Sequence, residues 1–217
     1  ADHPKIKNHL ATRVRPGKIS MIPYGADVIN NADSDLLVPY ELQPQQYVIV
    51  IARPEPENSI LEIVTAFSEQ QRNKTLVVLG DFNKANPQYR DQVFAAASSE
   101  VIFPGAIYDQ QVVNALRFYA CLYVHGHQVG GTNPSLVEAL GAGNPVLAHD
   151  NHFNRWVAGD GNTYFSNTRE CAQAFESLLD NVTLLQSIRQ QNRQHHQTTF
   201  TWDKILEQYE QVLLKKG

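Results

Sequence analysis

The chain has 217 residues, 42% of them hydrophobic and 18% charged, which is ordinary for a soluble globular protein of one sizeable domain or two small ones. Its formal net charge of −4 argues against broad binding to nucleic acid or to an anionic membrane. No apolar run approaches the ~20 residues of a membrane span. Two cysteines are too few for a disulfide framework, so Cys121 and Cys171 are expected to be buried small hydrophobes. These features predict a cytoplasmic protein.

The chain opens on ADHPKIKNHL, without an initiator methionine, and is expected to be a piece of a longer protein. A helical turn is predicted at 6–11, and a strand that ends in a turn is predicted at 18–27. Residues 28–46 have no clean period and read as a connecting segment.

From residue 47 onward, strands and helices alternate about every 25 residues, which is typical of a doubly wound parallel sheet. The run YVIVIA has the continuous β-branched character of a strand buried on both faces. Strands are predicted at 47–52, 75–80, 101–105, 121–125, 145–149 and 164–165.

Helices are predicted between these strands from apolar residues at helical spacing. After about residue 169 the character of the chain changes to amphipathic helix. The predicted helices are 60–67, 89–97, 110–120, 135–141, 153–157, 169–196 and 202–216.

In open α/β sheets, ligands bind at the carboxyl ends of the strands. The loops to inspect are therefore 53–59, 80–86, 104–109, 125–134 and 149–152. The fourth contains the run GHQVGGTNPS, in which glycines permit a close approach of backbone to ligand. The amides of Thr132 and Asn133, the Ser135 amide and hydroxyl, and the helix that follows would suit a phosphate. The alternative is a plain tight turn between strand and helix.

Two charged residues flank this region. Glu138 could accept hydrogen bonds from both vicinal hydroxyls of a ribose, or could simply be a solvated carboxylate near a helix N-terminus. Arg53 could bind a diphosphate with bidentate geometry, or could pair with Glu55 or Glu57.

Four histidines lie near the same strand ends: His125, His127, His149 and His152. Their spacing does not match a helical zinc motif, and no Asp or Cys cluster completes one. Neutral imidazoles that hydrogen-bond a sugar or a phosphate are the favoured interpretation, and no metal is expected.

Several common catalytic signatures are absent from the sequence. It contains no P-loop, no G-x-G-x-x-G after the first strand and no G-x-S-x-G elbow. This argues against a P-loop NTPase, a dinucleotide-dependent dehydrogenase and an α/β-hydrolase.

Taken together, these segments resemble the C-terminal, donor-binding half of a GT-B fold glycosyltransferase of family 4. The resemblance covers residues 19–216 and rests on the order of the segments ISMIPYGAD, YVIVIARPEPENS, LVVLGDF and VVNALRFYACLYVHGHQVGGTNPSLVEALGAGNPVLAHD. The phrase GGTNPSLVEALGAGNPVLAHDNHFNR is most similar to the rhamnosyltransferase branch, whose donor is dTDP-rhamnose.

The resemblance implies roles for individual positions. Glu138 corresponds to the second glutamate of the family's E-x7-E pair, which binds ribose. The first glutamate, which ordinarily contacts the donor sugar, falls at Gly130, so donor identity is open. Arg53 matches the diphosphate-binding arginine, whereas Asn58 stands where many members have a second cation.

Because that cation is missing, Thr132, Asn133, Ser135 and the helix N-terminus are expected to contribute more to diphosphate binding. The base is expected against Phe103, Pro104 and Ile107. The sugar-facing loop comprises His127, Gln128, Gly130 and Gly131.

The implied reaction is metal-independent transfer of a hexosyl group with retention, to a glycan or lipid-linked acceptor. The implied domains are 1–18, a remnant of a missing acceptor domain; 19–200, the Rossmann-like donor domain; and 201–217, a helix that crosses towards the missing domain. The fragment alone is expected to bind nucleotide without turnover, and any peripheral membrane association would come through the missing domain. The alternatives are a non-catalytic nucleotide-sugar-binding domain, and an epimerase or glycogen-synthase-like enzyme of the same fold.

Overall fold

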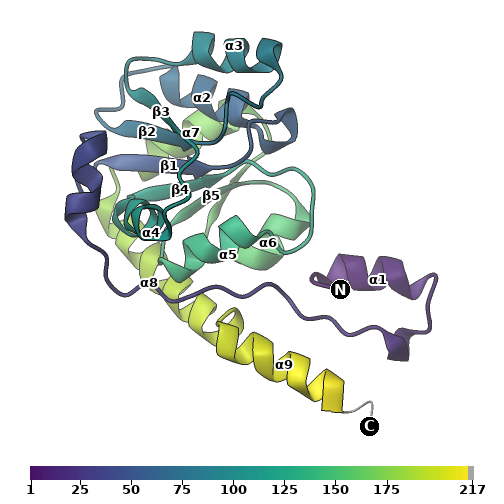
Figure 1. Ribbon diagram of the computed structural model, residues 1–217. Coiled ribbons are helices and arrows are strands. Elements are labelled where there is room, and N and C mark those ends of the chain that lie inside the picture. The colour runs from purple at the N-terminus through teal and green to yellow at the C-terminus, as the bar shows by residue number, and fades with distance from the viewer. Residues whose placement is uncertain (215–217) are drawn as a thin grey trace.

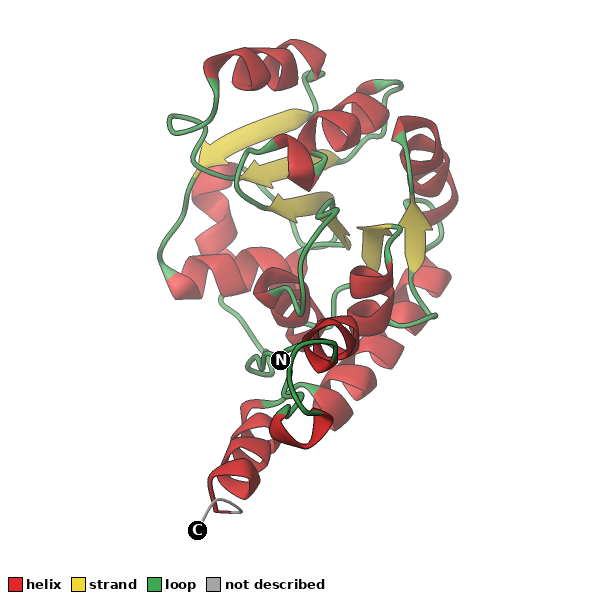
Figure 2. Cartoon of the chain, turned by 90° about the vertical axis from the view of Figure 1, so that its right-hand side faces the viewer, coloured by secondary structure: helices red, strands yellow, loops and turns green. Residues whose placement is uncertain are grey.

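A six-stranded parallel sheet lies at the centre of the computed structural model, which describes residues 1–214. The strand order is β3-β2-β1-β4-β5-β6, and every neighbouring pair is parallel. Helices cover both faces of the sheet (Figures 1 and 2). The predicted doubly wound α/β fold is therefore confirmed. The strands are β1 (Tyr47–Ile51), β2 (Thr75–Leu79), β3 (Val101–Gly105), β4 (Leu122–His125), β5 (Val146–His149) and β6 (Thr163–Phe165).

The central strand β1 shows why the apolar run forms a buried strand. It pairs with β2 on one side and β4 on the other, so that its backbone groups are satisfied within the sheet. Alternate side chains enter two separate hydrophobic cores: Val48 and Val50 face one, and Tyr47 and Ile49 face the other. A strand with apolar partners on both faces needs no polar alternation.

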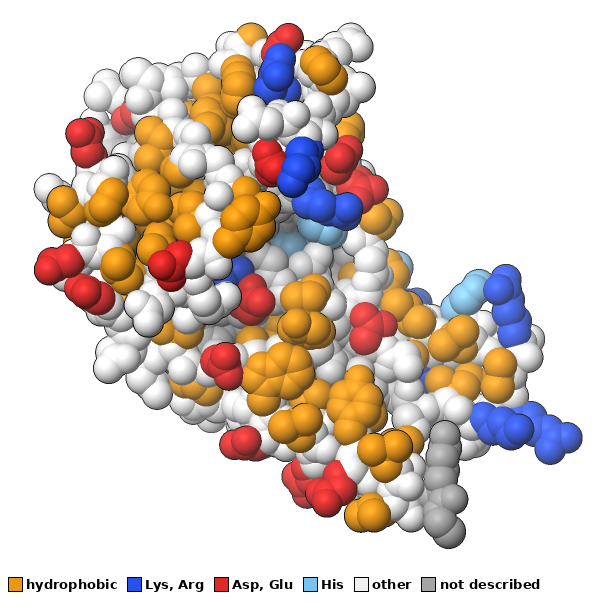
Figure 3. Space-filling model, in the orientation of Figure 1, with side chains coloured by type: hydrophobic (Ala, Val, Ile, Leu, Met, Phe, Trp, Pro, Cys, Tyr) orange, Lys and Arg blue, Asp and Glu red, His pale blue; other side chains and the backbone are white. Residues whose placement is uncertain are grey.

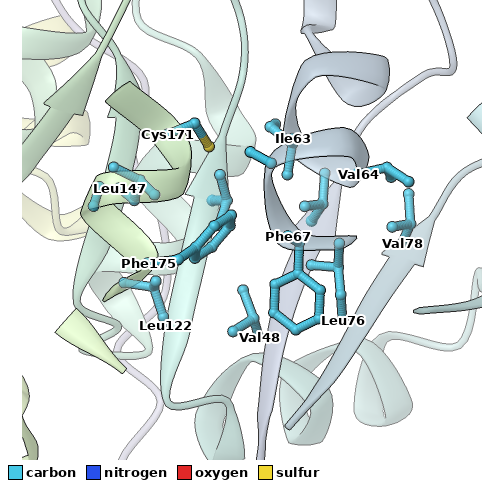
Figure 4. Close-up of a cluster of buried hydrophobic side chains, with 14 of the residues drawn as sticks. Val48, Ile63, Val64, Phe67, Leu76, Val78, Leu122, Leu147, Cys171 and Phe175 are labelled. Carbon is cyan, nitrogen blue, oxygen red and sulfur yellow. The ribbon is translucent and has the colours of Figure 1, made fainter. Parts of the chain in front are cut away.

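The helices divide between these two cores. Residues of α2, α3 and α7 pack on the face of Val48, and residues of α4, α5 and α6 pack on the opposite face. Figure 4 shows the first core, in which the Phe67 and Phe175 rings meet edge-to-face with centroids 5.3 Å apart. The helices are α1 (Pro4–Ala11), α2 (Ile60–Ser68), α3 (Pro87–Ala96), α4 (Gln110–Tyr119), α5 (Pro134–Gly141), α6 (His152–Ala158), α7 (Thr168–Leu178), α8 (Val182–Thr199) and α9 (Trp202–Leu214).

The sequence also encodes where many of these helices begin. An Asn or Asp stands at the N-cap of six of them, where its side-chain oxygen accepts from a free backbone N–H of the first turn. These caps are Asn86, Asp109, Asn133, Asn151, Asn167 and Asn181.

The predicted strand at 18–27 is wrong. A short 3-10 helix, η1 (Pro16–Lys18), begins this segment, and Ala26 forms an isolated bridge with Thr201 instead of joining the sheet. The Ala26 amide donates to the Phe200 carbonyl at 2.9 Å, and the Tyr24 ring packs on Trp202. The end of the segment therefore pairs with the turn before α9 and not with the sheet.

The predicted single helix at 169–196 is also wrong, because the chain breaks between α7 and α8. The Asn181 side chain accepts from the Leu184 amide and starts α8 as a new helix. The break lets α7 pack on α2 while α8 packs on α5. The connecting segment 28–46 contains the 3-10 helix η2 (Ser34–Tyr40). Another 3-10 helix, η3 (Pro56–Asn58), lies just before α2.

Helix α9 extends away from the sheet in both views (Figures 1 and 2). Only Ile205 is buried on it, and hydrophobic side chains gather over its surface in the lower part of Figure 3. The end of the predicted helix, at 215–216, lies outside the described residues. Within residues 1–214, no helix combines the length and apolar character needed to cross a membrane.

Candidate donor-binding site

The sheet order itself marks a place for a ligand. Connections from β1 and β4 leave in opposite directions along the sheet, and a crevice opens where the order reverses in this way. A cavity of about 410 Å³ lies at this edge, and Figure 3 shows the face hollowed there. Its walls come from the ends of β1 and β2, the loop after β3, and helices α4 and α5. The lining residues are Ile51, Ala52, Arg53, Leu79, Gly80, Asp81, Ala106, Ile107, Tyr108, Gln110, Val113, Arg117 and Glu138.

Arg53 is the cation at the β1 end of this cavity. Its side chain is 76% exposed and lies 3.6 Å from the Glu57 carboxylate, a pairing worth little at such exposure. Asn58 behaves differently: it is fully buried, and its amide donates to the Arg53 carbonyl at 2.8 Å. Asn58 therefore shapes the loop that carries Arg53 and does not project into the cavity.

The loop between β4 and α5 begins at Gly126 and ends at the N-cap Asn133, whose side chain accepts from the Ser135 amide at 3.1 Å. Gly130 has φ +137°, a backbone conformation that favours glycine. Gly126 packs so closely on the loop at Asn58 that an added Cβ would lie 2.0 Å from that residue's carbonyl oxygen. The two loops of the crevice are thus held against each other by backbone contact.

A carboxylate from the start of the chain already contacts this loop. The Thr132 amide donates to Asp2 Oδ2 at 3.1 Å, and the Thr132 hydroxyl donates to the Asp2 carbonyl. A Cβ on Gly131 would lie 2.4 Å from the same Oδ2. Asp2 is held by its neighbour His3, whose buried ring packs on Phe153. Thr132, predicted to meet a phosphate, meets an anion of the protein itself.

Glu138 lies on α5 and bounds the cavity from the β4 side. Its Oε2 accepts from Arg117 Nη2 at 2.5 Å. The Arg117 side chain is 4% exposed and that of Glu138 is 35% exposed. The Ser135 hydroxyl lies 3.4 Å from the same guanidinium nitrogen and 2.8 Å from the Tyr123 hydroxyl. Glu138 is therefore fixed by a buried cation and is not freely solvated.

Sequence reasoning missed Arg117 and Asp2. A signal for Arg117 existed: it falls four residues after Val113, on the apolar side of α4, where a charged residue needs a partner. Asp2 carried no such signal, because its contact spans 130 residues of sequence.

Of the residues predicted to hold a base, Ile107 lines the cavity. The Phe103 ring instead packs against Phe94, with centroids 4.8 Å apart, and Phe103 and Pro104 are not among the lining residues. Tyr108, not singled out from sequence, lines the cavity and is 83% exposed. The wall near the loop after β3 therefore consists of residues 106–108.

The four histidines do not form one cluster: His125 is buried, His127 and His149 are partly buried, and His152 is exposed. His125 and His127 lie with ring centroids 5.2 Å apart and nearly parallel planes. Burial lowers the pKa of His125 to about 3, and burial also lowers the pKa of His127 and of His149, so these imidazoles are neutral at physiological pH. Across the described residues, no group of three or more His, Cys, Asp or Glu could hold a metal ion.

Gln128, which belongs to the loop predicted to face the sugar, is exposed. Its amide donates to the Ser59 hydroxyl at 3.0 Å, which ties this loop to the start of α2. His127 is anchored through its carbonyl, which accepts from the Asn154 side chain at 2.8 Å. The loop is therefore fixed on both sides of the crevice.

The sheet order and the cavity at its switch point define the chain as a Rossmann-like α/β protein with a crevice of the kind in which such folds bind ligands. Residues 39–195 match the family model described as "Glycosyl transferases group 1". Because the match spans more than half of the chain, the protein belongs to this family. No curated protein matches the sequence.

Solved structures of GT-B glycosyltransferases have the same fold. A glycosyltransferase from Rickettsia africae is similar with a TM-score of 0.83 and 14% identity, over 98% of this chain and 61% of that one. Anabaena Alr3699/HepE, solved in complex with UDP-glucose, is similar with a TM-score of 0.85 and 16% identity, over 99% of this chain and 63% of that one. Sucrose-phosphate synthase from Thermosynechococcus elongatus is similar with a TM-score of 0.82 and 17% identity, over 99% of this chain and 57% of that one. The chain thus spans about three fifths of the length of these structures.

Proposed function

We propose that this chain is the donor-binding half of a retaining glycosyltransferase that moves a hexosyl group from a nucleoside diphosphate sugar to a glycan or lipid-linked acceptor. The observation that carries the proposal is the 410 Å³ cavity at the switch point, with Arg53 at its β1 side and Glu138 at its β4 side. A cation and a fixed carboxylate on opposite walls match the two polar parts of a nucleotide, its phosphates and its ribose.

In this proposal Arg53 binds the diphosphate, together with Asn133, Ser135, Thr132 and the N-terminus of α5. The exposed, weakly paired state of the Arg53 guanidinium supports its role, because little must be broken before it can bind phosphate. Asn58 acts through the loop that it holds.

The rest of the nucleotide lies along the cavity. Glu138 accepts from the pentose of the nucleotide, through the 3′-hydroxyl of deoxyribose in dTDP or the ribose hydroxyls in UDP. The base contacts Ile107, with Phe103 and Pro104 supporting that wall from β3. The sugar faces His127, Gln128, Gly130 and Gly131, where neutral imidazoles and backbone groups are the available partners.

Transfer is metal-independent in this proposal. The departing diphosphate gains negative charge, which Arg53 and the N–H groups at the start of α5 stabilise, an electrostatic contribution of the oxyanion-hole kind. The acceptor hydroxyl attacks the anomeric carbon with net retention.

The donor is proposed to be dTDP-rhamnose, on the likeness of the segment from Gly130 to the rhamnosyltransferase branch. UDP-glucose is the competing donor, because the similar Anabaena structure is described in complex with it. Glycine at position 130 removes a side chain from the sugar-facing loop, which suits a donor with fewer hydroxyl contacts.

The acceptor is proposed to bind a second domain that precedes residues 1–18, and the helix at 201–217 is proposed to cross towards it. The share of the similar structures that this chain spans supports this division. The chain alone then binds nucleotide but does not turn over, and membrane association of the whole enzyme would come through that second domain. Two buried, unpaired cysteines suit a cytoplasmic setting.

Calorimetric titration of the chain with dTDP and UDP tests the donor site. Binding should be lost or strongly weakened in Arg53→Ala and Glu138→Gln. It should be retained in Arg90→Ala, because Arg90 is a partly exposed arginine of α3 that lies outside the cavity. If neither dTDP nor UDP binds, the proposed donor site is excluded. Transfer assays of the full-length protein with dTDP-rhamnose and with UDP-glucose then identify the sugar.

The second candidate is a non-catalytic nucleotide-sugar-binding domain. The carboxylate of Asp2 on the Thr132 amide, and the inward turn of Asn58, favour it, because both reduce the positive potential offered to a diphosphate. A GT-B epimerase or synthase is the other alternative. Product analysis with the full-length protein separates these alternatives. A glycosylated acceptor supports the transferase, and a free epimerised donor supports the epimerase. The absence of both products supports a binding domain.

A further inference from the structure

The carboxylate of Glu138 is held by a charged contact that no proposed role requires. Arg117 Nη2 donates to one oxygen, Oε2, at 2.5 Å. The arginine is buried on α4, whereas about a third of the glutamate side chain is exposed. Both residues line the same cavity, so the pair forms part of its wall.

The pair is continued by a chain of hydroxyl groups beneath α5. The guanidinium approaches the Ser135 hydroxyl at 3.4 Å, that hydroxyl meets the Tyr123 hydroxyl at 2.8 Å, and Tyr123 reaches the His125 ring at 3.4 Å. Tyr123 and His125 are buried in the sheet. The guanidinium is thus connected to groups that the strand β4 holds in place.

Burying a guanidinium is costly unless it is paired. The Arg117 guanidinium is paired through Nη2 with Glu138, whereas its Nε has no partner among the described residues. Its position has a consequence for Glu138: Oε2 is bound by Arg117 of α4, whereas Oε1 has no hydrogen-bond partner among the described residues and is available to a ligand.

We propose that Arg117 is the positioning residue for nucleotide binding, which fixes Glu138 so that Oε1 accepts from a ribose hydroxyl and which neutralises Glu138 in front of an anionic ligand. This inference rests on the proposed donor site. Without Arg117, Glu138 would be a half-exposed side chain with several rotamers, and its full negative charge would face the diphosphate.

The ligand that reports on this role is a nucleoside diphosphate that lacks the hydroxyl. Whichever of dTDP and UDP binds more tightly is titrated beside its 3′-deoxy analogue. A hydrogen bond to a charged acceptor contributes roughly 1.5–3 kcal/mol, so the wild-type chain should prefer the hydroxylated ligand by about tenfold or more.

The variants then separate positioning from folding. Arg117→Gln should bind both ligands more weakly and reduce the preference to about twofold, because Glu138 is released. Arg117→Lys, which keeps the charge but loses the planar guanidinium, should give an intermediate preference; it also serves if the glutamine variant does not fold. Arg72→Gln is the matched control, since Arg72 is likewise buried but bonds the Phe67 and Ala66 carbonyls away from the cavity.

These titrations distinguish between failure of the donor site, of the ribose role of Glu138 and of the positioning role of Arg117. No binding of either ligand by the wild type would refute the donor site itself, and equal binding of both would refute the ribose role of Glu138. A wild-type preference that persists undiminished in folded Arg117→Lys and Arg117→Gln would overturn the positioning role alone. A preference lost in these variants and kept in Arg72→Gln supports it.

Discussion

The two sides of the switch-point crevice are built differently. At the end of β1, Arg53 is exposed and weakly paired with Glu57 at 3.6 Å. At the end of β4, the polar groups are already engaged inside the protein: Thr132 with Asp2, Ser135 with Tyr123, and Glu138 with Arg117. The β1 side presents an exposed charge, whereas the polar groups of the β4 side are held in place before any ligand binds.

The difference shows how the cost of binding a ligand is divided. A side chain fixed before binding loses little conformational entropy on binding, but its existing partners must tolerate the ligand. An exposed arginine loses more entropy and gains more from a new charged contact. We therefore expect the β1 side to control affinity and the β4 side to control which ligand is accepted.

The largest effect should come from the β1 side. Arg53→Ala should weaken binding of dTDP or UDP about 50-fold, because charge-assisted hydrogen bonds contribute roughly 1.5–3 kcal/mol. Calorimetry measures the change, and the melting temperature should stay close to that of the wild type because the side chain is exposed. A loss below threefold would mean that the diphosphate does not bind at the β1 end.

The next largest effect is expected on the free energy of unfolding and comes from His125, a buried residue on the β4 side. The unfolded pKa of His125 is near 6.5, and burial lowers the folded pKa to about 3. Between these values the unfolded state binds a proton that the folded state excludes, so the free energy of unfolding falls as the pH decreases below 6.5. This residue alone contributes a slope of up to about 1.4 kcal/mol per pH unit, a tenfold change in the folding equilibrium.

Denaturant unfolding at pH 7.5, 6.5 and 5.5 measures that slope. His125→Asn, which keeps an acceptor near the Tyr123 hydroxyl but cannot titrate, should have a smaller acid-side slope than the wild type. If the two slopes coincide, His125 is not held neutral by its surroundings, and the β4 side is less tightly packed than described.

A smaller effect is expected from Asp2. Asp2→Asn keeps an acceptor for the Thr132 amide but removes a negative charge from the loop, worth on the order of 1 kcal/mol in attraction of a diphosphate at intermediate dielectric. Affinity for dTDP or UDP should rise about fivefold, and more at low salt. Weaker binding would instead make the Asp2 carboxylate part of the ligand site.

The smallest effect is expected from the partner of Arg53. Glu57→Gln removes an exposed ion pair, which contributes little to stability, so nucleotide affinity should rise by about twofold with no measurable change in melting temperature. A rise as large as that of Asp2→Asn would show that the β1 side is as constrained as the β4 side, and would remove the contrast between them.

Three of the residues singled out from the sequence line the cavity, because they lie where local patterns end. Arg53 follows a strand run directly, and Glu138 lies one turn after a glycine-rich loop; both line the cavity. Ile107 follows the third strand in the same way. The preference of Phe103 for Phe82 and Phe94 could not be read from sequence, because side chains of one strand alternate between faces that only packing distinguishes.

Segments whose structure depends on distant partners were predicted incorrectly. Residues 18–27 look like a strand, but their backbone hydrogen bonds go to Ala1 and to the turn at Phe200 instead of to the sheet. The helix predicted at 169–196 is divided where Asn181 caps α8, and the division lets α7 and α8 pack on different helices.

By itself, the sequence determined the six strands, most of the helices and the loops that carry the site, because apolar periodicity, N-cap residues and glycine act over a few residues. The tertiary structure alone decided what the polar groups of those loops contact. Arg117 meets Glu138 across 21 residues of sequence and Asp2 meets Thr132 across 130. Such contacts depend on how the layers pack, since a charge is satisfied by whatever partner the fold brings within hydrogen-bonding distance.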